Sequence, residues 1–109
     1  MQPFLIVRTY SDAVYKLQTT CANAIVLPPD EAQDVTIGSR LLVTNETRDA
    51  ILTVVNRITQ SRLEYFTPQD VDALGYASRR GVVHYLENYW FANPPAVIWN
   101  IIGVQHVSE

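Results

Sequence analysis

Two adjacent arginines, Arg79 and Arg80, stand where the sequence predicts the start of a helix over 79–90. A helix start presents unpaired backbone N–H groups and the positive end of the helix dipole, so the two guanidinium groups there could bind a phosphate. His84 follows one turn later on the same side and could donate a hydrogen bond or act as a general base near neutral pH. A solvated helix start and a structural histidine are the alternative interpretations.

Further arginine and aromatic side chains could extend such an anion site. Of the eight Lys and Arg residues, Lys16 is the only lysine, and arginine is suited to forked contacts with phosphates and carboxylates. Arg40, Arg57 and Arg62 lie on or beside predicted strands and would line a groove if they converge with Arg79 and Arg80. Aromatic side chains that could stack on bases, or pack in the core, are Tyr85, Tyr89, Trp90 and Phe91.

Composition excludes several other classes of protein. The chain has 109 residues, a net charge of -3 and one cysteine, Cys21, so it cannot form an internal disulfide. No Cys/His cluster has the spacing of a zinc site, and we expect no metal and no cofactor. Asp70 and Asp72 do not share a helix face, which argues against a paired-carboxylate site there. No apolar run is long enough to span a membrane, and the expected compartment is the cytoplasm.

Apolar patterning and turn residues predict the elements that would position these side chains. β-branched and apolar runs predict strands over 4–9, 23–27, 40–43, 50–58 and 96–107, and a helix over 12–19 follows a Ser11 cap. A second helix begins at Thr67, Pro68 and Asp70 and ends at Gly75, and a third, capped by Ser78, spans 79–90. The order β-α-β-loop-β-β-α-α-β favours one α+β domain over 1–109 with a mixed or barrel-like sheet.

Several segments together resemble the ASCH domain. These are Ile-Gly-Ser-Arg-Leu-Leu-Val at 37–43, the run 50–58, the stretch 66–80 with its Thr-x-x-Asp-x-x-x-x-Gly-Tyr pattern, Leu-Glu-Asn-Tyr at 86–89, and Pro-Ala-Val-Ile-Trp-Asn-Ile at 95–101. ASCH domains belong to the PUA-like superfamily, so the resemblance implies a small β-barrel with about three short helices packed at its openings.

The resemblance also bears on catalysis. The family's Gly-x-Lys-x-x-Glu-x-Arg signature should follow the first helix, where this chain has Leu-Gln-Thr-Thr-Cys-Ala-Asn-Ala-Ile at 17–25. Relatives that hydrolyse N(4)-acetylcytidine use a lysine, a threonine and a glutamate, which correspond here to Thr19, Thr20 and a position near Arg80. A threonine hydroxyl alone is a weak nucleophile, so the alignment argues against that hydrolysis.

The expected function is therefore binding of RNA, or of a modified nucleoside within it, without catalysis. The predicted binding residues are Arg79, Arg80, Arg40, His84 and Arg57, with an aromatic ring under the base. One alternative is a hydrolase or ribonuclease that acts on nucleic acid, with Thr20, His84 and either Tyr10 or Tyr15 as candidates. The other is a small protein-interaction module, which the net acidity and the aromatic residues of the carboxy-terminal half favour.

Overall fold

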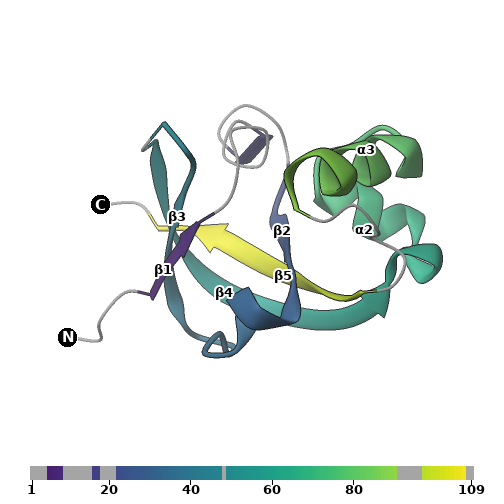
Figure 1. The fold of residues 1–109 in the computed structure, drawn as a ribbon. Coiled ribbons are helices and arrows are strands. Elements are labelled where there is room, and N and C mark those ends of the chain that lie inside the picture. The colour runs from purple at the N-terminus through teal and green to yellow at the C-terminus, as the bar shows by residue number, and fades with distance from the viewer. Residues whose placement is uncertain (1–4, 9–15, 18–21, 48, 91–96, 108–109) are drawn as a thin grey trace.

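The computed structural model describes residues 5–8, 16–17, 22–47, 49–90 and 97–107, without the side chains of Arg8 and Tyr89. Figure 1 shows strands and helices separated into a curved sheet and a helical layer at one end of it. The elements in chain order are β1 (Leu5–Arg8), β2 (Ala24–Leu27), the 3-10 helix η1 (Pro29–Ala32), β3 (Arg40–Thr44), β4 (Ala50–Arg62), the 3-10 helix η2 (Leu63–Tyr65), α2 (Pro68–Ala73), α3 (Arg79–Tyr89) and β5 (Ile98–His106).

The described strands form one five-stranded sheet in the order β1-β3-β4-β5-β2. β1 runs parallel to β3, whereas the three other pairings are antiparallel. The α+β class is thus confirmed, but the prediction of a barrel is wrong, because β1 and β2 are the edges and do not pair in the described sheet. These edge strands have four residues each. Val7 of β1 and Ile25 and Leu27 of β2 belong to the same buried core.

Strand β4 is the longest element and holds the sheet together. Its first part pairs with β3 as far as Val54, and its second part pairs with β5 as far as Arg62. A register shift between Val55 and Arg57 bends the strand between the two parts. The sequence predicted that this strand ends at residue 58, but the ladder to β5 continues it to Arg62. The extension carries Arg62 to the helical end of the molecule (Figure 1).

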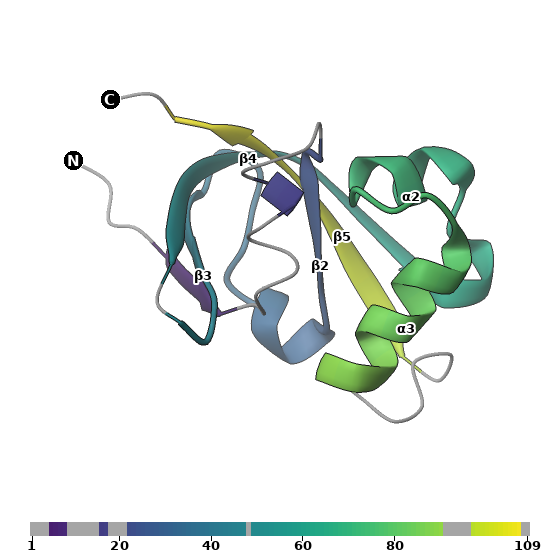
Figure 2. The same ribbon diagram turned by 90° about the horizontal axis from the view of Figure 1, so that it is seen from above.

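Alternate residues of β5 face two different cores. Trp99 and Ile101 are fully buried on the side of α2 and α3, where they pack with Phe66, Val82 and Leu86. Ile102 and Val104 belong to the second core, in which Leu27 of β2 and Leu41 and Val43 of β3 are also buried. Figure 2 shows α2 and α3 on one side of the β2–β5 pair and η1 at the carboxy-terminal end of β2. Because β5 is apolar on both faces, it is central rather than half-solvated.

The helices at residues 67–90 begin and end where the sequence predicted. Thr67 accepts a hydrogen bond from the Asp70 N–H, and Asp70 accepts one from the Thr67 N–H, which together form a capping box. Gly75 follows α2 with a φ of 89°, a left-handed conformation that favours glycine. Ser78 caps α3 without a side-chain hydrogen bond. Of the helix predicted over 12–19, residues 16 and 17 are helical and the rest lies outside the described residues.

The two left-handed glycines predict different costs of substitution. Gly38 has a φ of 92° and open space where an added methyl group would lie, whereas a Cβ at Gly75 would lie 3.0 Å from both Ala22 Cβ and Lys16 Cδ. Gly38→Ala should therefore cost the conformational strain alone, about 1 kcal/mol. Gly75→Ala should cost at least about 1 kcal/mol more, because it adds a packing clash. Urea denaturation measures both values, and equal losses of stability would contradict the predicted clash.

Candidate functional site

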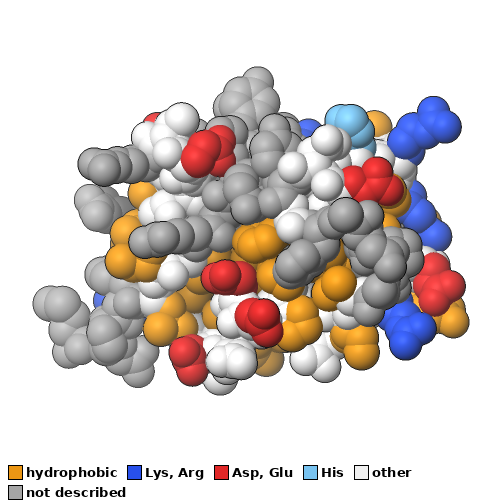
Figure 3. Space-filling model, in the orientation of Figure 1, with side chains coloured by type: hydrophobic (Ala, Val, Ile, Leu, Met, Phe, Trp, Pro, Cys, Tyr) orange, Lys and Arg blue, Asp and Glu red, His pale blue; other side chains and the backbone are white. Residues whose placement is uncertain are grey.

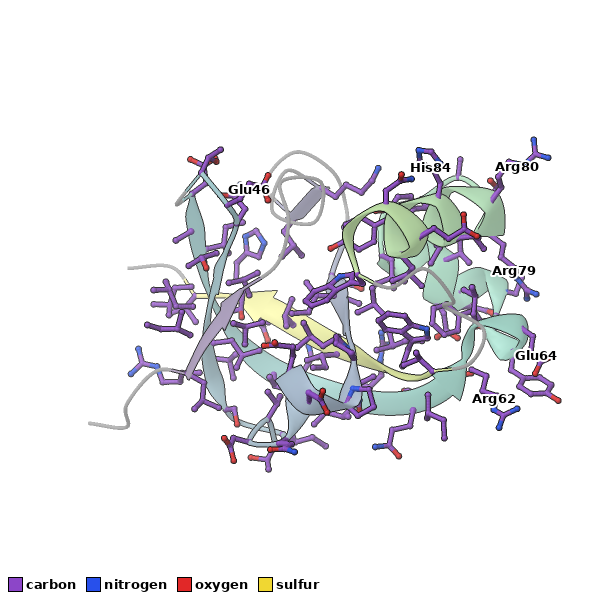
Figure 4. All side chains as sticks on the ribbon, in the orientation of Figure 1. Glu46, Arg62, Glu64, Arg79, Arg80 and His84 are labelled. Atoms are coloured by element: carbon purple, nitrogen blue, oxygen red, sulfur yellow. The ribbon has the colours of Figure 1, made fainter. Side chains whose placement is uncertain are left out.

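Three arginines project from the end of the molecule where β4 stops and α3 starts. Arg62 is the last residue of β4, and Arg79 and Arg80 are the first two of α3. Figure 4 shows these three side chains extending outward at that end, with Glu64 between Arg79 and Arg62. In Figure 3 the Lys and Arg side chains gather along this edge, with a carboxylate among them. We call the group Arg62, Arg79 and Arg80 the arginine end.

Within the arginine end, Arg79 has a structural role. Its guanidinium donates one hydrogen bond to the Glu64 carbonyl oxygen at 3.0 Å and another to the Phe66 carbonyl oxygen at 2.6 Å. These bonds tie the start of α3 to the turn that follows β4. A guanidinium has five N–H donors, so Arg79 keeps donors for a ligand. Arg80 is exposed, and in the described part of the chain no ion pair or hydrogen bond engages its side chain or that of Arg62.

Tyr65 is an exposed aromatic residue at the same end of the molecule, and no pattern in the sequence singled it out. It is the last residue of η2, which connects Arg62 to Phe66, and it is 70% exposed. A large apolar ring at such exposure is a candidate contact surface for a ligand or partner. The only sequence signal for it is its position three residues after Arg62, since a 3-10 turn of three residues has no periodicity to detect.

A pocket of about 390 Å³ opens beside the arginine end, between Phe66, α2 and the start of α3. Its apolar wall includes Phe66, Val71 and Tyr76, and its polar groups include Asp72, Ser78 and Arg79. The Tyr76 ring is held in place, because the Lys16 ammonium lies 4.5 Å from its centroid and the Tyr85 ring lies 6.1 Å away. This arrangement suits a small planar ligand with hydrogen-bonding groups.

The structure separates two of the predicted binding arginines from the arginine end. Arg40 pairs with Val54, eight residues before Arg62 on β4, which at about 3.3 Å per residue is roughly 25 Å along the strand. Arg57 pairs with Gly103, roughly 17 Å from Arg62 by the same spacing, on the face of the sheet that carries the helices. The four arginines and one histidine that were predicted to bind RNA therefore do not form one groove. Of the three arginines predicted on or beside strands, Arg62 is the one that lies at the same end of the molecule as Arg79 and Arg80.

Arg57 lines a different pocket, of about 330 Å³, between β4 and α2. Asp70 and Asp72 of α2 line it too, with polar side chains from Thr59, Gln69 and Asn23. Two carboxylates beside one guanidinium make this pocket poorly suited to a phosphate. The interpretation of Asp70 as a capping residue is confirmed.

The remaining candidates divide between exposed, buried and undescribed positions. His84 is exposed on α3 near Arg80 (Figure 4), and its carbonyl oxygen accepts a hydrogen bond from Asn88 Nδ2 at 2.7 Å. Tyr85 is buried and its hydroxyl accepts a hydrogen bond from Trp90 Nε1 at 3.3 Å, so it belongs to the core rather than to a stacking surface. Thr20 and the other catalytic candidates, Tyr10 and Tyr15, lie outside the described residues, as do Thr19, Cys21 and Phe91.

Two negative findings concern the described residues alone. Across residues 5–8, 16–17, 22–47, 49–90 and 97–107, no group of three or more His, Cys, Asp or Glu side chains is arranged to hold a metal ion. Over the same ranges, no helix is long and apolar enough to cross a membrane.

Comparisons with known proteins show the fold and no function. No protein-family model matches this sequence, and a search of curated proteins finds no match either. The structure is similar to that of protein EF3133 from Enterococcus faecalis V583, of family DUF984, with a TM-score of 0.71 and 8% identity, over 98% of this chain and 82% of that one. It is also similar to hypothetical protein PH0355, with a TM-score of 0.69 and 13% identity, over 94% of this chain and 97% of that one. The chain therefore shares a small α+β fold with these proteins.

The hydrogen bonds of Arg79 predict a difference between two adjacent arginines. Arg79→Met removes both bonds to carbonyl oxygens and should lower the free energy of unfolding. The loss should be only about 1 kcal/mol, because water competes for these bonds near the surface. Arg80→Met removes no bond within the described chain and should leave stability within about 0.5 kcal/mol of the parent. Thermal unfolding of both variants measures the difference. An equal loss of stability in the two would show that the hydrogen bonds of Arg79 do not stabilise the fold.

Proposed function

We propose that this chain is an ASCH-type domain of the PUA-like superfamily that binds single-stranded RNA, or a modified nucleoside within it, at the arginine end. The observation that carries the proposal is Tyr65, an exposed ring on the turn between Arg62 and the segment that leads to Arg79 and Arg80. Arginines bind the phosphates of a strand, and an aromatic ring stacks on one of its bases. The arginine end combines both functions on one surface.

The phosphate contacts are assigned to Arg62 and Arg80. Both side chains extend into solvent at the same end of the molecule (Figure 4). The α3 start adds backbone N–H groups, because the Ser78 side chain does not cap them. Arg79 contributes charge, while its bonds to the Glu64 and Phe66 carbonyl oxygens hold the turn that carries Tyr65. Glu64 lies between the arginines and opposes an anion there.

The base contacts are assigned to Tyr65 and to the pocket between Phe66, α2 and α3. Stacking on a ring is tolerant of sequence, so Tyr65 would hold a base without selecting it. The pocket lies next to Arg79 and is lined by Phe66 and Tyr76, so a second base or a modified one could enter it. Selectivity for a modification would then depend on the pocket rather than on Tyr65.

The two alternative functions are weaker on the same observations. For a hydrolase of the N(4)-acetylcytidine type, the alignment puts Arg80 near the position of the glutamate, and Arg80 is an exposed cation on α3. For a protein-interaction module, Tyr65 and the 50% exposed Ile98 supply an apolar contact. Three arginines at one end favour a polyanion over a general protein surface.

Fluorescence anisotropy of labelled single-stranded RNA tests the phosphate contacts. Arg62→Gln and Arg80→Gln should each weaken binding and reduce the slope of log K against log[salt] by about 0.7, since each removes one phosphate contact. Arg40→Gln is the matched control, because it changes the net charge equally at a position paired with Val54, eight residues before Arg62 along β4. Equal losses of affinity in all three variants would show that binding depends on the net charge and not on the arginine end. Absence of binding at low salt would overturn the proposal.

Stacking predicts a separate signature for Tyr65. Tyr65→Ala should weaken RNA binding by about 1–3 kcal/mol and leave the salt slope unchanged, because a ring contributes no counterion release. Ile37→Ala, which removes another exposed apolar side chain, should leave binding unchanged. A gel of each sample reports whether the strand is cut. Cut RNA would support the hydrolase, and unchanged affinity in Tyr65→Ala would remove the observation on which the proposal stands.

The position of Glu64 predicts a gain of affinity. Glu64→Gln removes the carboxylate between Arg62 and Arg79 while preserving the backbone carbonyl that Arg79 binds. RNA binding should tighten about two- to five-fold at low salt, and the gain should shrink as salt screens the charge. The same titration with Glu31→Gln, an equal charge change on η1, controls for net charge. An equal gain in both variants would contradict a local effect at the arginine end.

A further inference from the structure

A third pocket, of about 270 Å³, lies on the face of the sheet opposite α2 and α3. Its floor includes Ile58 and Gln60 of β4 and their partners Ile102 and Asn100 of β5. These side chains share a face because alternate residues of a strand point the same way, and Ile102 is part of the core on this side. The remaining wall comes from η1 and the residues that follow it, through Pro29, Gln33 and Val35.

Asn100 is the unusual residue of this pocket. It interrupts the apolar run of β5 and is only 5% exposed, so most of its amide has left water. Gln60 Nε2 donates a hydrogen bond to Asn100 Oδ1 at 3.2 Å. Neither amide makes another side-chain hydrogen bond within the part of the chain that the structure describes. The Asn100 amide N–H groups and the Gln60 amide oxygen therefore keep hydrogen-bonding capacity at the floor of the pocket.

A donor and an acceptor on neighbouring amides match a particular kind of ligand. A ring edge that carries an N–H beside a carbonyl, or an amino group beside a ring nitrogen, presents the complementary acceptor and donor, and nucleobases have such edges. Gln33 adds a third amide at the rim. Ile58, Val35 and Ile102 supply apolar contacts for the faces of a planar ring. The volume is near the lower end of ligand pockets, about 300–1,000 Å³, which fits one small heterocycle.

We propose that this amide pocket binds an uncharged planar heterocycle of the nucleobase class, as a free base or nucleoside, through Asn100, Gln60 and Gln33. The charge on the η1 side of the pocket argues for an uncharged ligand there, while Arg62 lies two residues beyond Gln60 on the same face of β4. Asp30, Glu31 and Asp34 are exposed on η1 and just after it, adjacent in sequence to the lining residues Pro29 and Gln33. These carboxylates disfavour a phosphate on that rim. The site goes beyond the proposed function, because RNA is assigned to Tyr65 and the arginine end, and none of these residues lines this pocket.

Titration of ¹⁵N-labelled protein with cytidine, uridine, adenosine and guanosine tests the pocket. At least one nucleoside should shift the side-chain amide signals of Asn100, Gln60 and Gln33 and saturate them together. The 5′-monophosphate of that nucleoside should bind more weakly at low salt, owing to the acidic rim. Indole, a planar ring without the paired acceptor and donor, should bind more weakly than the nucleoside. No saturable shift with any nucleoside, or equal binding of indole, would overturn the proposal.

Two variants assign the recognition to the amides. Gln60→Leu and Asn100→Leu should each raise the nucleoside Kd about three- to ten-fold, by loss of a hydrogen bond at similar side-chain volume. Gln105→Leu is the matched control, since Gln105 is an exposed amide on β5 that does not line the pocket. Gln60 is exposed, so Gln60→Leu tests the site even if Asn100→Leu does not fold. An unchanged Kd in Gln60→Leu would overturn the assignment.

The same variants separate this inference from the proposed function. Gln60→Leu should leave the affinity and salt dependence of RNA binding intact, and Tyr65→Ala should leave nucleoside binding intact. If nucleosides bind and RNA does not, the amide pocket stands without the arginine end. Loss of both activities in Gln60→Leu, with the protein still folded, would show one continuous site and overturn the separation proposed here.

Discussion

The antiparallel ladder between β4 and β5 is the interaction on which the rest of the molecule depends. It runs from Thr53 opposite His106 to Arg62 opposite Ile98, with a bulge between Val55 and Arg57. The bulge lets a single strand pair with β3 at one end and with β5 at the other, so one element connects both halves of the sheet. Without the last part of this ladder, Arg62 would not reach the helical end, and the turn that carries Tyr65 would have no fixed starting point.

Alternation along this ladder divides the chemistry of the protein between two faces. On one face, Trp99 and Ile101 form the floor against which α3 packs, and this packing holds Arg79 and Arg80 at their end of the molecule. On the other face, Asn100 and Ile102 form the floor of the amide pocket. A shift of register by one residue would exchange the two sets and bury Asn100 against the helices. The buried amide and the fully buried Trp99 therefore constrain the same register from opposite sides.

The similarity to EF3133 and PH0355, at 8% and 13% identity, is a likeness of fold. A curled sheet with helices over one end needs apolar residues at alternating and helical spacings, and many sequences meet that requirement. The features that we propose for function are individual surface residues on this frame. Arg62, Tyr65 and Arg80 are all exposed, so the core does not determine their identity. Their chemistry must be tested in this chain, since a shared fold does not carry it over.

The sequence by itself determined the order and type of most elements. Apolar and β-branched runs placed β2, β3 and β5, and Thr67, Asp70 and Gly75 placed the start and end of α2. These signals are local, because a cap or an apolar alternation involves only residues within a few positions of one another. The helix start that carries Arg79 and Arg80 was predicted for the same reason.

Tertiary structure alone decided what comes together. The open sheet, the extension of β4 to Arg62, and the separation of Arg40 and Arg57 from the arginine end follow from strand pairing between distant segments. The hydrogen bond between Gln60 and Asn100 joins residues forty positions apart. Spacing in the chain holds no information about such contacts, since they are set by register and by which faces of the sheet the two cores cover.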